Sequence, residues 1–455
     1  MSQDKLIASV SGLRGVVGTA LQPEGIVRYV AAAAAEFAPG RVLVSRDGRP
    51  SGIALARLVE GTLAALGRTV LSGAVLATPT VGVLVSSRRL AGAVQITASH
   101  NPAPYNGLKL FDASGRVVAP QVGYRIGQLF QNLSLAQCPW AAHDQIGQLL
   151  DLENPHEEHL QRILATVDVE RIRACKFRVL LDSNHGAGSG LGIRLLRELS
   201  CEVRCLGETP DGQFEHPPEP TAENLAAVAS QVPALSADVG FCQDPDADRL
   251  ALIDEHGRYV GEEYTVALCV MRRLQQRAGP VVINCATSRM TVDLCQQAGV
   301  PCLRAPVGEA HVVEAMRKSG AVYGGEGNGG PIDPDVGWVR DSFAGMAQIL
   351  DLMAVSGKKL SQLAAMLPQY HIVKSKVICP SPQVLDQVLR RLERQWNSTA
   401  SVDRQDGVRW DWEDKWVLVR GSNTEPIVRV IAEARSREQA NQLCEVVVRA
   451  FEERS

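Results

Sequence analysis

One pattern recurs along the chain: a short, uninterrupted apolar run, then a polar loop rich in Gly, Asp or Asn, then a helical pattern. The apolar runs occupy residues 40–44, 93–96, 178–181 and 280–283. Strands without polar alternation suit a sheet that is buried on both faces, and alternation with helices is typical of α/β units. Ligands of such units bind beyond the carboxyl ends of the strands. The sequence therefore predicts an α/β protein whose chemistry lies in the polar loops.

The openings at residues 40, 178 and 280 resemble one another and indicate a repeated α/β unit of about 100–140 residues. The C-terminal segment differs, because residues 415–420 and 427–432 predict paired strands, and Ser436 with Gln439 forms a capping box before an amphipathic helix. A chain of 455 residues is long enough for more than one domain. We expect four domains, at residues 1–150, 151–255, 256–368 and 369–455.

The composition excludes several classes of function. Lys and Arg number 47 against 50 Asp and Glu, so a near-neutral chain without a basic run argues against nucleic acid as a partner. No apolar stretch is long enough to span a bilayer, and the N-terminus lacks a signal pattern. The 11 Cys, without any C-x-x-C, fit neither a disulfide framework nor a zinc site. We expect a cytoplasmic protein without a membrane or nucleic-acid partner.

The first loop that carries chemistry follows the apolar run at 93–96 and contains Ser99, His100 and, further on, Lys109. A serine on a rigid turn needs neighbouring acid–base or charged groups to act as a nucleophile or to carry a phosphoryl group. His100 and Lys109 are candidates for these roles. The alternative is an ordinary strand-to-helix turn in which Ser caps the helix.

The second loop places Asp244, Asp246 and Asp248 at alternate positions. At about 4 Å and an effective dielectric near 20, each carboxylate pair would repel by roughly 4 kcal/mol, and a divalent cation removes that repulsion. All-oxygen ligands favour Mg²⁺, Ca²⁺ or Mn²⁺ over zinc. An EF-hand loop is disfavoured, because Arg249 stands where its turn needs Gly and a strand pattern follows. A solvated acidic turn remains the alternative.

Two further loops suit a phosphorylated sugar. The glycine-rich segment 324–330 carries Glu326 and Asn328, which suit sugar hydroxyls, although it also fits a plain flexible loop. It matches neither a P-loop nor a dinucleotide fingerprint. The segment 420–426 with Arg429 combines two Arg, two hydroxyls and turn amides into a candidate phosphate cradle, or else a plain hairpin turn. Together the four loops indicate phosphoryl transfer on a phosphorylated sugar.

In this order and spacing, the four motifs resemble the α-D-phosphohexomutase superfamily, which includes phosphoglucomutase, phosphomannomutase and phosphoglucosamine mutase. The segments 11–18, 46–49, 210–214 and 218–225 support the resemblance, which extends from about residue 7 to 452. It implies a heart-shaped protein with a central cleft. Three domains would share a mixed α/β topology, and a smaller α+β fourth domain would close over the cleft.

The resemblance also implies a role for each site residue. Ser99 would be the phosphoserine, and its phosphate would hold one Mg²⁺ together with Asp244, Asp246 and Asp248. Sugar contacts would come from Glu326 and Asn328, with Glu309 and His311 as a second contact. The groups around the transferred phosphoryl would be Arg14, His100, Lys109 and Arg249, with Lys109 a candidate for proton transfer. The non-reacting phosphate would be held by Arg420, Ser422, Asn423, Thr424 and Arg429.

The implied activity interconverts a hexose 6-phosphate and a hexose 1-phosphate, through phosphoserine and a hexose 1,6-bisphosphate that also serves as activator. Many members carry Glu-x-Ser-Gly-His in the sugar loop, whereas here Asn328 replaces Ser and Gly330 replaces His. Length and motif style favour glucosamine as the sugar, with glucose and mannose as alternatives. A sugar-phosphate phosphatase and a non-catalytic sugar-phosphate sensor remain as alternatives, and the assembly is expected to be a monomer or a homodimer.

Overall fold

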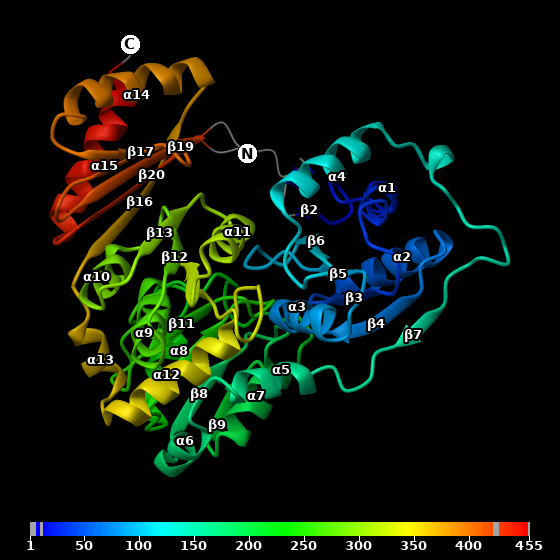
Figure 1. Cartoon of the computed structure of the whole chain (residues 1–455), viewed down its shortest axis with the longest axis horizontal. Coiled ribbons are helices and arrows are strands. Elements are labelled where there is room, and N and C mark those ends of the chain that lie inside the picture. Colours follow the sequence, from blue (N-terminus) through cyan, green and yellow to red (C-terminus); the bar gives the residue numbers. More distant parts are fainter. Residues whose placement is uncertain (1–5, 10–11, 422–426, 454–455) are drawn as a thin grey trace.

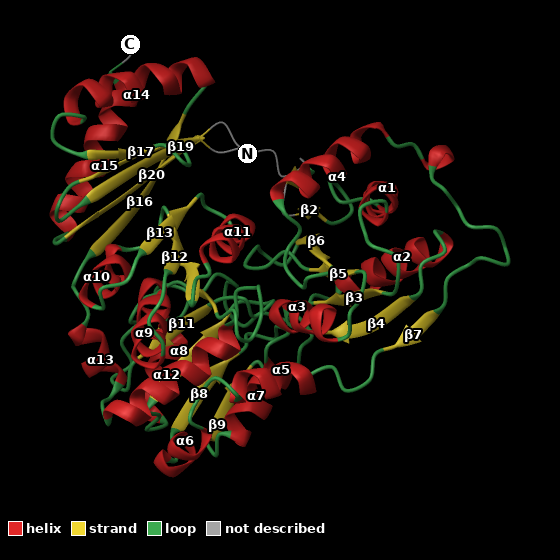
Figure 2. Cartoon of the chain, viewed as in Figure 1, coloured by secondary structure: helices red, strands yellow, loops and turns green. Residues whose placement is uncertain are grey.

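The computed structural model describes residues 6–9, 12–421 and 427–453, which form four units that each contain one sheet. Figure 1 shows these units along an arc, with unit I and unit IV at its two ends, and Figure 2 shows helices beside every sheet. The expectation of four α/β and α+β units is confirmed. The domain limits near 150, 255 and 368 stay a prediction.

Unit I is built on a seven-stranded sheet with the order β1-β2-β6-β5-β3-β4-β7. Its strands are β1 (Ile7–Ser9), β2 (Gly12–Val16), β3 (Val42–Arg46), β4 (Val70–Val75), β5 (Gly92–Ile96), β6 (Tyr105–Asp112) and β7 (Leu149–Asp151). Its helices are α1 (Pro23–Ala34), α2 (Ser51–Ala65), α3 (Thr78–Ser87), α4 (Pro120–Asn132) and the 3₁₀ turn η1 (Leu135–Gln137).

Units II and III each have a four-stranded sheet. Unit II comprises β8 (Arg178–Asp182), β9 (Glu202–Leu206), β10 (Val239–Gln243) and β11 (Leu250–Ile253), with α5 (Glu157–Leu164), α6 (Val169–Cys175), α7 (Ser189–Glu198) and α8 (Ala226–Ala234). Unit III comprises β12 (Val281–Asn284), β13 (Cys302–Ala305), β14 (Tyr323–Glu326) and β15 (Gly330–Ile332), with α9 (Glu262–Gln276), α10 (Arg289–Gln297), α11 (Glu309–Ser319), α12 (Ser342–Ser356) and α13 (Leu360–Met366).

The same strand order occurs in the first three units. It reads β4-β3-β5-β6 in the centre of unit I, β9-β8-β10-β11 in unit II and β13-β12-β14-β15 in unit III. In each case the first three strands are parallel and the fourth is antiparallel. The predicted repeat is therefore confirmed, and the loop between the third strand and the antiparallel fourth has an equivalent place in every unit.

Buried strands explain the continuous apolar runs. Val42, Leu43 and Val44 of β3 are all buried, as are Val281, Val282 and Ile283 of β12, because side chains on both faces of these sheets are covered. One hydrophobic cluster includes side chains of both unit II and unit III, among them Phe241 and Phe343. The two units are thus packed into one continuous core.

Unit IV is an antiparallel sheet with the order β16-β20-β19-β18-β17. Its elements are β16 (His371–Ile378), β17 (Ser401–Asp403), β18 (Val408–Asp411), β19 (Trp416–Gly421), β20 (Ile427–Ala434), α14 (Pro382–Trp396) and α15 (Arg437–Glu452). The expected strand pair is β19 with β20, and Ser436 caps α15 by accepting a hydrogen bond from Gln439 N at 3.3 Å. The helices α14 and α15 pack on one face of this sheet. On its other face, Trp416 and Leu418 pack against Cys285 of unit III.

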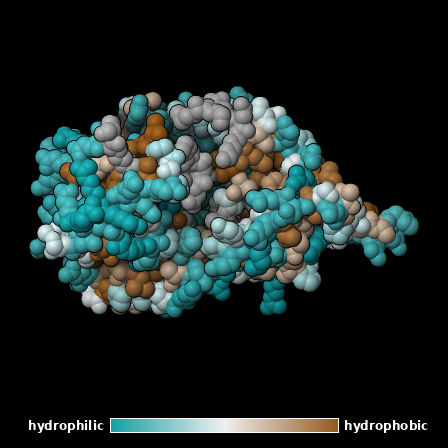
Figure 3. All heavy atoms as spheres, turned by 90° about the horizontal axis from the view of Figure 1, so that it is seen from above, coloured by the Kyte–Doolittle hydropathy of each residue, from teal (hydrophilic) through white to brown (hydrophobic). Residues whose placement is uncertain are grey.

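The described residues contain no helix that is long and apolar enough to cross a membrane. The face seen in Figure 3 is hydrophilic over most of its area, and the hydrophobic residues form separate small groups there.

Candidate active site

Three of the predicted loops meet at one place because they are equivalent in the repeated fold. The Ser99 loop follows β5, the Asp loop follows β10 and the Glu326 loop follows β14. Ser99 Oγ donates to Asp244 Oδ2 at 2.7 Å, which joins the loops of units I and II. Asp248 and Glu326 both bind Arg340, at 2.5 and 2.9 Å, which joins units II and III. The structure therefore brings these three sets of predicted residues into one polar cluster.

A tight network fixes the Ser99 loop. Ser99 is buried and has a φ of 49°, in the left-handed region that a non-glycine residue rarely adopts. Its backbone N–H donates to Thr97 Oγ1 at 2.9 Å, and Thr97 in turn donates to Asp47 at 2.8 Å. The Arg49 guanidinium donates to the carbonyls of Ser99 and Asn101, at 2.7 and 2.6 Å. The segment that follows β3 thus holds the Ser99 loop in place.

Three of the predicted groups, His100, Arg14 and Arg249, lie at the Ser99 loop or act on the carboxylate that it contacts. His100 Nδ1 lies 3.4 Å from Ser99 Oγ, and burial together with the charges of Arg249 and Arg14 lowers the pKa of His100 to about 2, so this imidazole is neutral. Arg14 of β2 donates to Asn101 Oδ1 at 2.7 Å. Arg249, which ends the Asp loop, lies close enough to oppose the rise in the pKa of Asp244 that burial causes.

Lys109 of β6 is paired with the acidic loop. Its Nζ lies 2.8 Å from Asp248 Oδ2 and 3.3 Å from Asp246 Oδ2. Burial alone would lower the pKa of Lys109, but these two carboxylates outweigh burial and raise it. Lys109 is therefore a fixed positive charge between units I and II in this structure.

Asp244, Asp246 and Asp248 are fully buried, and one carboxylate oxygen from each lies within 4.8 Å of the others. No other such group of possible metal ligands occurs among the residues that the structure describes. Burial, followed by the other two carboxylates, raises the pKa of Asp244 well above its usual value. Asp246 Oδ1 and Asp248 Oδ1 are buried without a hydrogen-bond partner. Three oxygen ligands with two unsatisfied oxygens fit a hard divalent cation such as Mg²⁺.

The sugar loop is held by partners that the sequence did not reveal. Glu326 accepts hydrogen bonds from Asn284 Nδ2 at 2.8 Å, from the Gly308 backbone at 2.9 Å and from Arg340. With its side-chain amide turned so that oxygen and nitrogen exchange places, Asn328 donates to the Glu326 carbonyl at 3.3 Å and accepts from Arg340 at 3.0 Å. Glu309 accepts from the Arg340 backbone at 2.7 Å. The predicted residues Glu309, Glu326 and Asn328 therefore lie together around one arginine.

Sequence reasoning missed Arg340 because it lies outside the four motifs, directly before α12. It also missed Thr78 at the start of α3, which donates to Asp246 Oδ2 at 2.7 Å, and Asn284 at the end of β12. The sequence predicts polar loops at the carboxyl ends of β3 and β12. Because these loops have equivalent places in the repeat, the repeat was the signal that could have identified Arg49 and Asn284. Nothing in the sequence near Arg340 and Thr78 distinguishes them from surface residues.

The predicted phosphate cradle lies in unit IV. Arg420 of β19 is directly opposite Arg429 of β20, and Arg429 is opposite Lys376 of β16. Like charges in opposite positions repel, which favours an anion beside this cationic row (Lys376, Arg429 and Arg420). Arg420 also forms an ion pair with Asp406 at 3.0 Å. Between described residues, no hydrogen bond or ion pair joins the row to the Ser99 cluster.

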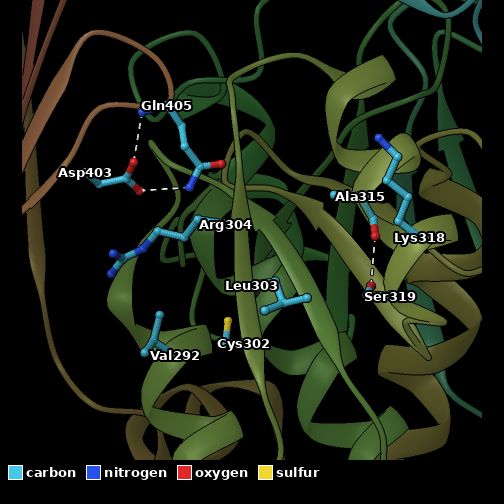
Figure 4. Close-up of a pocket in the computed structure, with 9 residues that line it drawn as sticks. All are labelled: Val292, Cys302, Leu303, Arg304, Ala315, Lys318, Ser319, Asp403 and Gln405. Atoms are coloured by element: carbon cyan, nitrogen blue, oxygen red, sulfur yellow. Dashed lines mark hydrogen bonds between the residues drawn. The ribbon is translucent and has the colours of Figure 1, made fainter.

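Three members of the predicted cradle, Ser422, Asn423 and Thr424, lie outside the described residues. A separate surface hollow of about 720 Å³ is lined by residues of β13, α10, α11 and unit IV, including Cys302, Arg304 and Asp403 (Figure 4). It contains none of the predicted site residues, and it runs along the edge strand β13 rather than at the loops that carry chemistry.

Comparison with known proteins finds relatives that match all four units of the chain. Family models described as phosphoglucomutase/phosphomannomutase alpha/beta/alpha domains I, II and III match residues 5–137, 157–257 and 262–370, and the C-terminal domain model matches 375–450. A Burkholderia thailandensis protein of this family has the same fold, with a TM-score of 0.86 at 24% identity over 100% of this chain and 99% of that one. Aspergillus fumigatus N-acetylphosphoglucosamine mutase, solved with GlcNAc-6P and magnesium, shares the fold with a TM-score of 0.57 at 16% identity, over 93% and 98% of the two chains.

Two relatives are similar over nearly their full length. A Methanopyrus kandleri protein named "probable phosphoglucosamine mutase" is 37% identical, over 97% of this chain and 98% of its own. A Thermococcus kodakarensis phosphoglucomutase/phosphomannomutase is 34% identical, over 97% of each chain. With four matching family models and these relatives, the chain belongs to the phosphoglucomutase/phosphomannomutase family of the α-D-phosphohexomutase superfamily and is a mutase, an isomerase enzyme.

Proposed function

We propose that the protein converts glucosamine 6-phosphate to glucosamine 1-phosphate through a phosphorylated Ser99 and an enzyme-bound 1,6-bisphosphate. The observation that carries the proposal is the 2.7 Å contact between Ser99 Oγ and Asp244, a member of the only carboxylate triad of this kind among the described residues. A hydroxyl on a rigid, strained turn beside a hard-metal site suits a residue that accepts and returns a phosphoryl group.

The residues of the chain divide the chemistry between them. Asp244, Asp246 and Asp248 would hold one Mg²⁺, which when bound neutralises charge on the phosphoryl oxygens. Arg14, Arg249 and Lys109 add fixed positive charges around the same oxygens. In each half-reaction the bond between phosphorus and the donor oxygen breaks as a bond to the acceptor oxygen forms, and the proton of the acceptor hydroxyl ends on the donor oxygen. The raised pKa of Lys109 and the lowered pKa of His100 make the first a charge stabiliser and the second a neutral hydrogen-bond partner.

The sugar would be held by the loop of unit III and the phosphate by unit IV. Glu326, Asn328 and Glu309 offer acceptors and donors to hydroxyls. Arg420 and Arg429 offer guanidinium groups to the phosphate that does not react, with Ser422, Asn423 and Thr424 as further proposed contacts. The names of two relatives, a phosphoglucosamine mutase and a phosphoglucomutase/phosphomannomutase, support glucosamine as the first sugar to test and glucose and mannose as the next. The fold relative solved with GlcNAc-6P and magnesium supports a phosphosugar substrate and the metal.

The test is ³¹P NMR of the purified protein with Mg²⁺ and a trace of hexose 1,6-bisphosphate. Glucosamine, glucose and mannose 6-phosphates are offered separately. A 1-phosphate signal that appears fastest with glucosamine 6-phosphate supports the proposal, and faster turnover of another sugar reassigns the substrate. Release of inorganic phosphate without a 1-phosphate would identify a phosphatase. No reaction with any of the three sugars, together with measurable binding, would identify a sensor.

A further inference from the structure

Arg340 contacts both the metal loop and the sugar loop. Its guanidinium donates to Asp248 Oδ2 at 2.5 Å and to Glu326 Oε2 at 2.9 Å, and its Nε lies 3.8 Å from Glu309 Oε2. The residue is only 8% exposed. Three carboxylates from units II and III therefore share one buried positive charge, and each depends on it to offset burial and mutual repulsion.

The stem of Arg340 lies where a side chain at position 330 would lie. A Cβ added to Gly330 would be 2.3 Å from Arg340 Cδ and 2.9 Å from its Cγ. The backbone of Gly330 is outside the left-handed region, and the three atoms nearest to such a Cβ all belong to Arg340. Gly330 is also a position where the sequence departs from the common sugar-loop pattern. Gly330 and Arg340 are thus structurally coupled, because the arginine, which comes from outside the loop, fills the space beside the glycine.

We propose that Arg340 is a positioning residue that links the metal site to the sugar site, and that Gly330 makes room for it. The proposal rests on the proposed function, because it assigns Asp248 to the metal and Glu326 to the sugar. Arg340 holds one oxygen of Asp248, and the other oxygen of that carboxylate stays unpartnered and available to a cation. The same guanidinium contacts Glu326 and, in the turned amide orientation, Asn328.

This arrangement predicts that loss of the Arg340 charge strengthens the binding of a divalent cation and weakens the binding of the sugar phosphate. Without Arg340, the triad carries more uncompensated negative charge, so a divalent cation binds more tightly. Glu326 loses its only ion-pair partner among the described residues, and its uncompensated charge repels an anionic sugar phosphate, so the sugar phosphate binds more weakly. General damage to the fold would instead weaken both ligands together.

The experiment compares Arg340→Met with the wild type. Mn²⁺ binding is followed by electron paramagnetic resonance without substrate, and sugar-phosphate binding is followed by calorimetry in EDTA. We expect about threefold to tenfold tighter Mn²⁺ binding and at least about tenfold weaker sugar-phosphate binding. Arg340→Lys should restore the Mn²⁺ affinity but not the sugar affinity, because one ammonium group does not reproduce the planar fork that bridges two carboxylates.

The matched control is Arg272→Met, which breaks a buried ion pair with Asp351 at 2.8 Å between α9 and α12 of the same unit, away from the site. It should change neither affinity. If Arg340→Met does not fold, Gly330→Ala decides instead, because its added methyl displaces the arginine stem and should move both affinities in the same directions by smaller factors. Weaker binding of both Mn²⁺ and the sugar phosphate, or no change in either affinity, would overturn the proposal. A wild type that binds neither ligand would contradict the proposed function itself.

Discussion

Ser99 occupies left-handed backbone with a φ of 49°, which costs a residue with a Cβ on the order of 1–3 kcal/mol. The network around Thr97, Asp47 and Arg49 stabilises this conformation and aims the hydroxyl at Asp244. Because the proposed reaction passes through Ser99 Oγ, Ser99→Ala should lower turnover by on the order of 10⁴-fold or more while substrate binding persists. Turnover is measured by ³¹P NMR and binding by calorimetry.

The control for Ser99→Ala is Ser86→Ala, which removes a half-buried hydroxyl that donates to Val83 O outside the site. It should retain wild-type turnover. A Ser99→Ala enzyme that interconverts the sugar phosphates at a comparable rate would show that another group carries the phosphoryl.

Asp246 tests the metal assignment separately from the serine. One of its oxygens accepts from Thr78, and the other is buried without a partner. Asp246→Asn removes a negative ligand but keeps the shape, so the Mg²⁺ concentration that gives half-maximal activity should rise by about tenfold or more, and Mn²⁺ binding should weaken with it. Asp254→Asn is the matched control, because Asp254 is a buried acid of the same unit that only caps a turn. An unchanged metal dependence in Asp246→Asn would remove the assignment.

The buried carboxyl of Glu263 in α9 predicts that stability depends on pH. Burial raises the pKa of this carboxyl from 4.5 to about 8, although Lys374 opposes the shift. Between those values the folded protein holds a proton that the unfolded chain has released, so the free energy of unfolding falls as pH rises from about 4.5 to 8. Glu263→Gln removes this proton linkage.

Thermal unfolding of both proteins from pH 5 to 9 checks this expectation. Each unit of pKa shift corresponds to about 1.4 kcal/mol, so even part of the shift gives a measurable slope. The melting temperature of the wild type should fall more steeply with pH than that of Glu263→Gln. Parallel curves would show that Glu263 titrates near its usual pKa.

At the level of elements, the sequence predicts the strands well because their residues are buried on both faces and carry an unbroken apolar signal. Val42–Val44, Leu180–Leu181 and Val281–Ile283 all lie in the predicted strands. The hairpin of unit IV and its capped helix could also be predicted from the sequence, because the patterns that indicate them lie within a few neighbouring residues. Contacts across units were not, since Arg340 and Thr78 acquire their roles only when loops far apart in the chain meet.

The start of α12 shows how one element supports the site. Asp341 accepts hydrogen bonds from the backbone N–H groups of Phe343 and Ala344, at 2.9 and 3.1 Å, and contacts His159 Nε2 at 2.8 Å. His159 in turn contacts Thr80 of α3 at 2.9 Å, so three units meet at this cap. Asp341→Ala removes the cap and leaves Nε2 of the buried His159 imidazole without its partner.

We expect Asp341→Ala to lower the free energy of unfolding by about 2–4 kcal/mol, the sum of a lost cap and an unsatisfied buried group. Ser436→Ala, which removes the cap of α15 alone, should cost about 1 kcal/mol. Urea denaturation followed by circular dichroism measures both. Equal effects would mean that the His159 contact adds nothing.

At the scale of the whole molecule, unit IV is held to unit III by polar and aromatic contacts. Arg304 pairs with Asp411 through two contacts, at 3.0 and 3.1 Å, and the Arg409 guanidinium donates to the Cys285 carbonyl at 2.5 Å. These contacts place the cationic row on the sheet face that also packs on unit III, because Leu418 and Ile431 lie on the same face. A bisphosphate bound to both this row and the Ser99 cluster would link the two ends of the arc.

This geometry predicts that hexose 1,6-bisphosphate makes the molecule more compact. The ligand would pull unit IV toward unit I and exclude water, which would otherwise compete as phosphoryl acceptor. Small-angle X-ray scattering should show a smaller radius of gyration with the ligand than without it. Arg420→Ala with Arg429→Ala removes two charge-assisted contacts, so the compaction should disappear and KM should rise by about tenfold or more. Compaction that persists in this double variant would place the phosphate elsewhere, and an unchanged radius in the wild type would show that catalysis proceeds without closure.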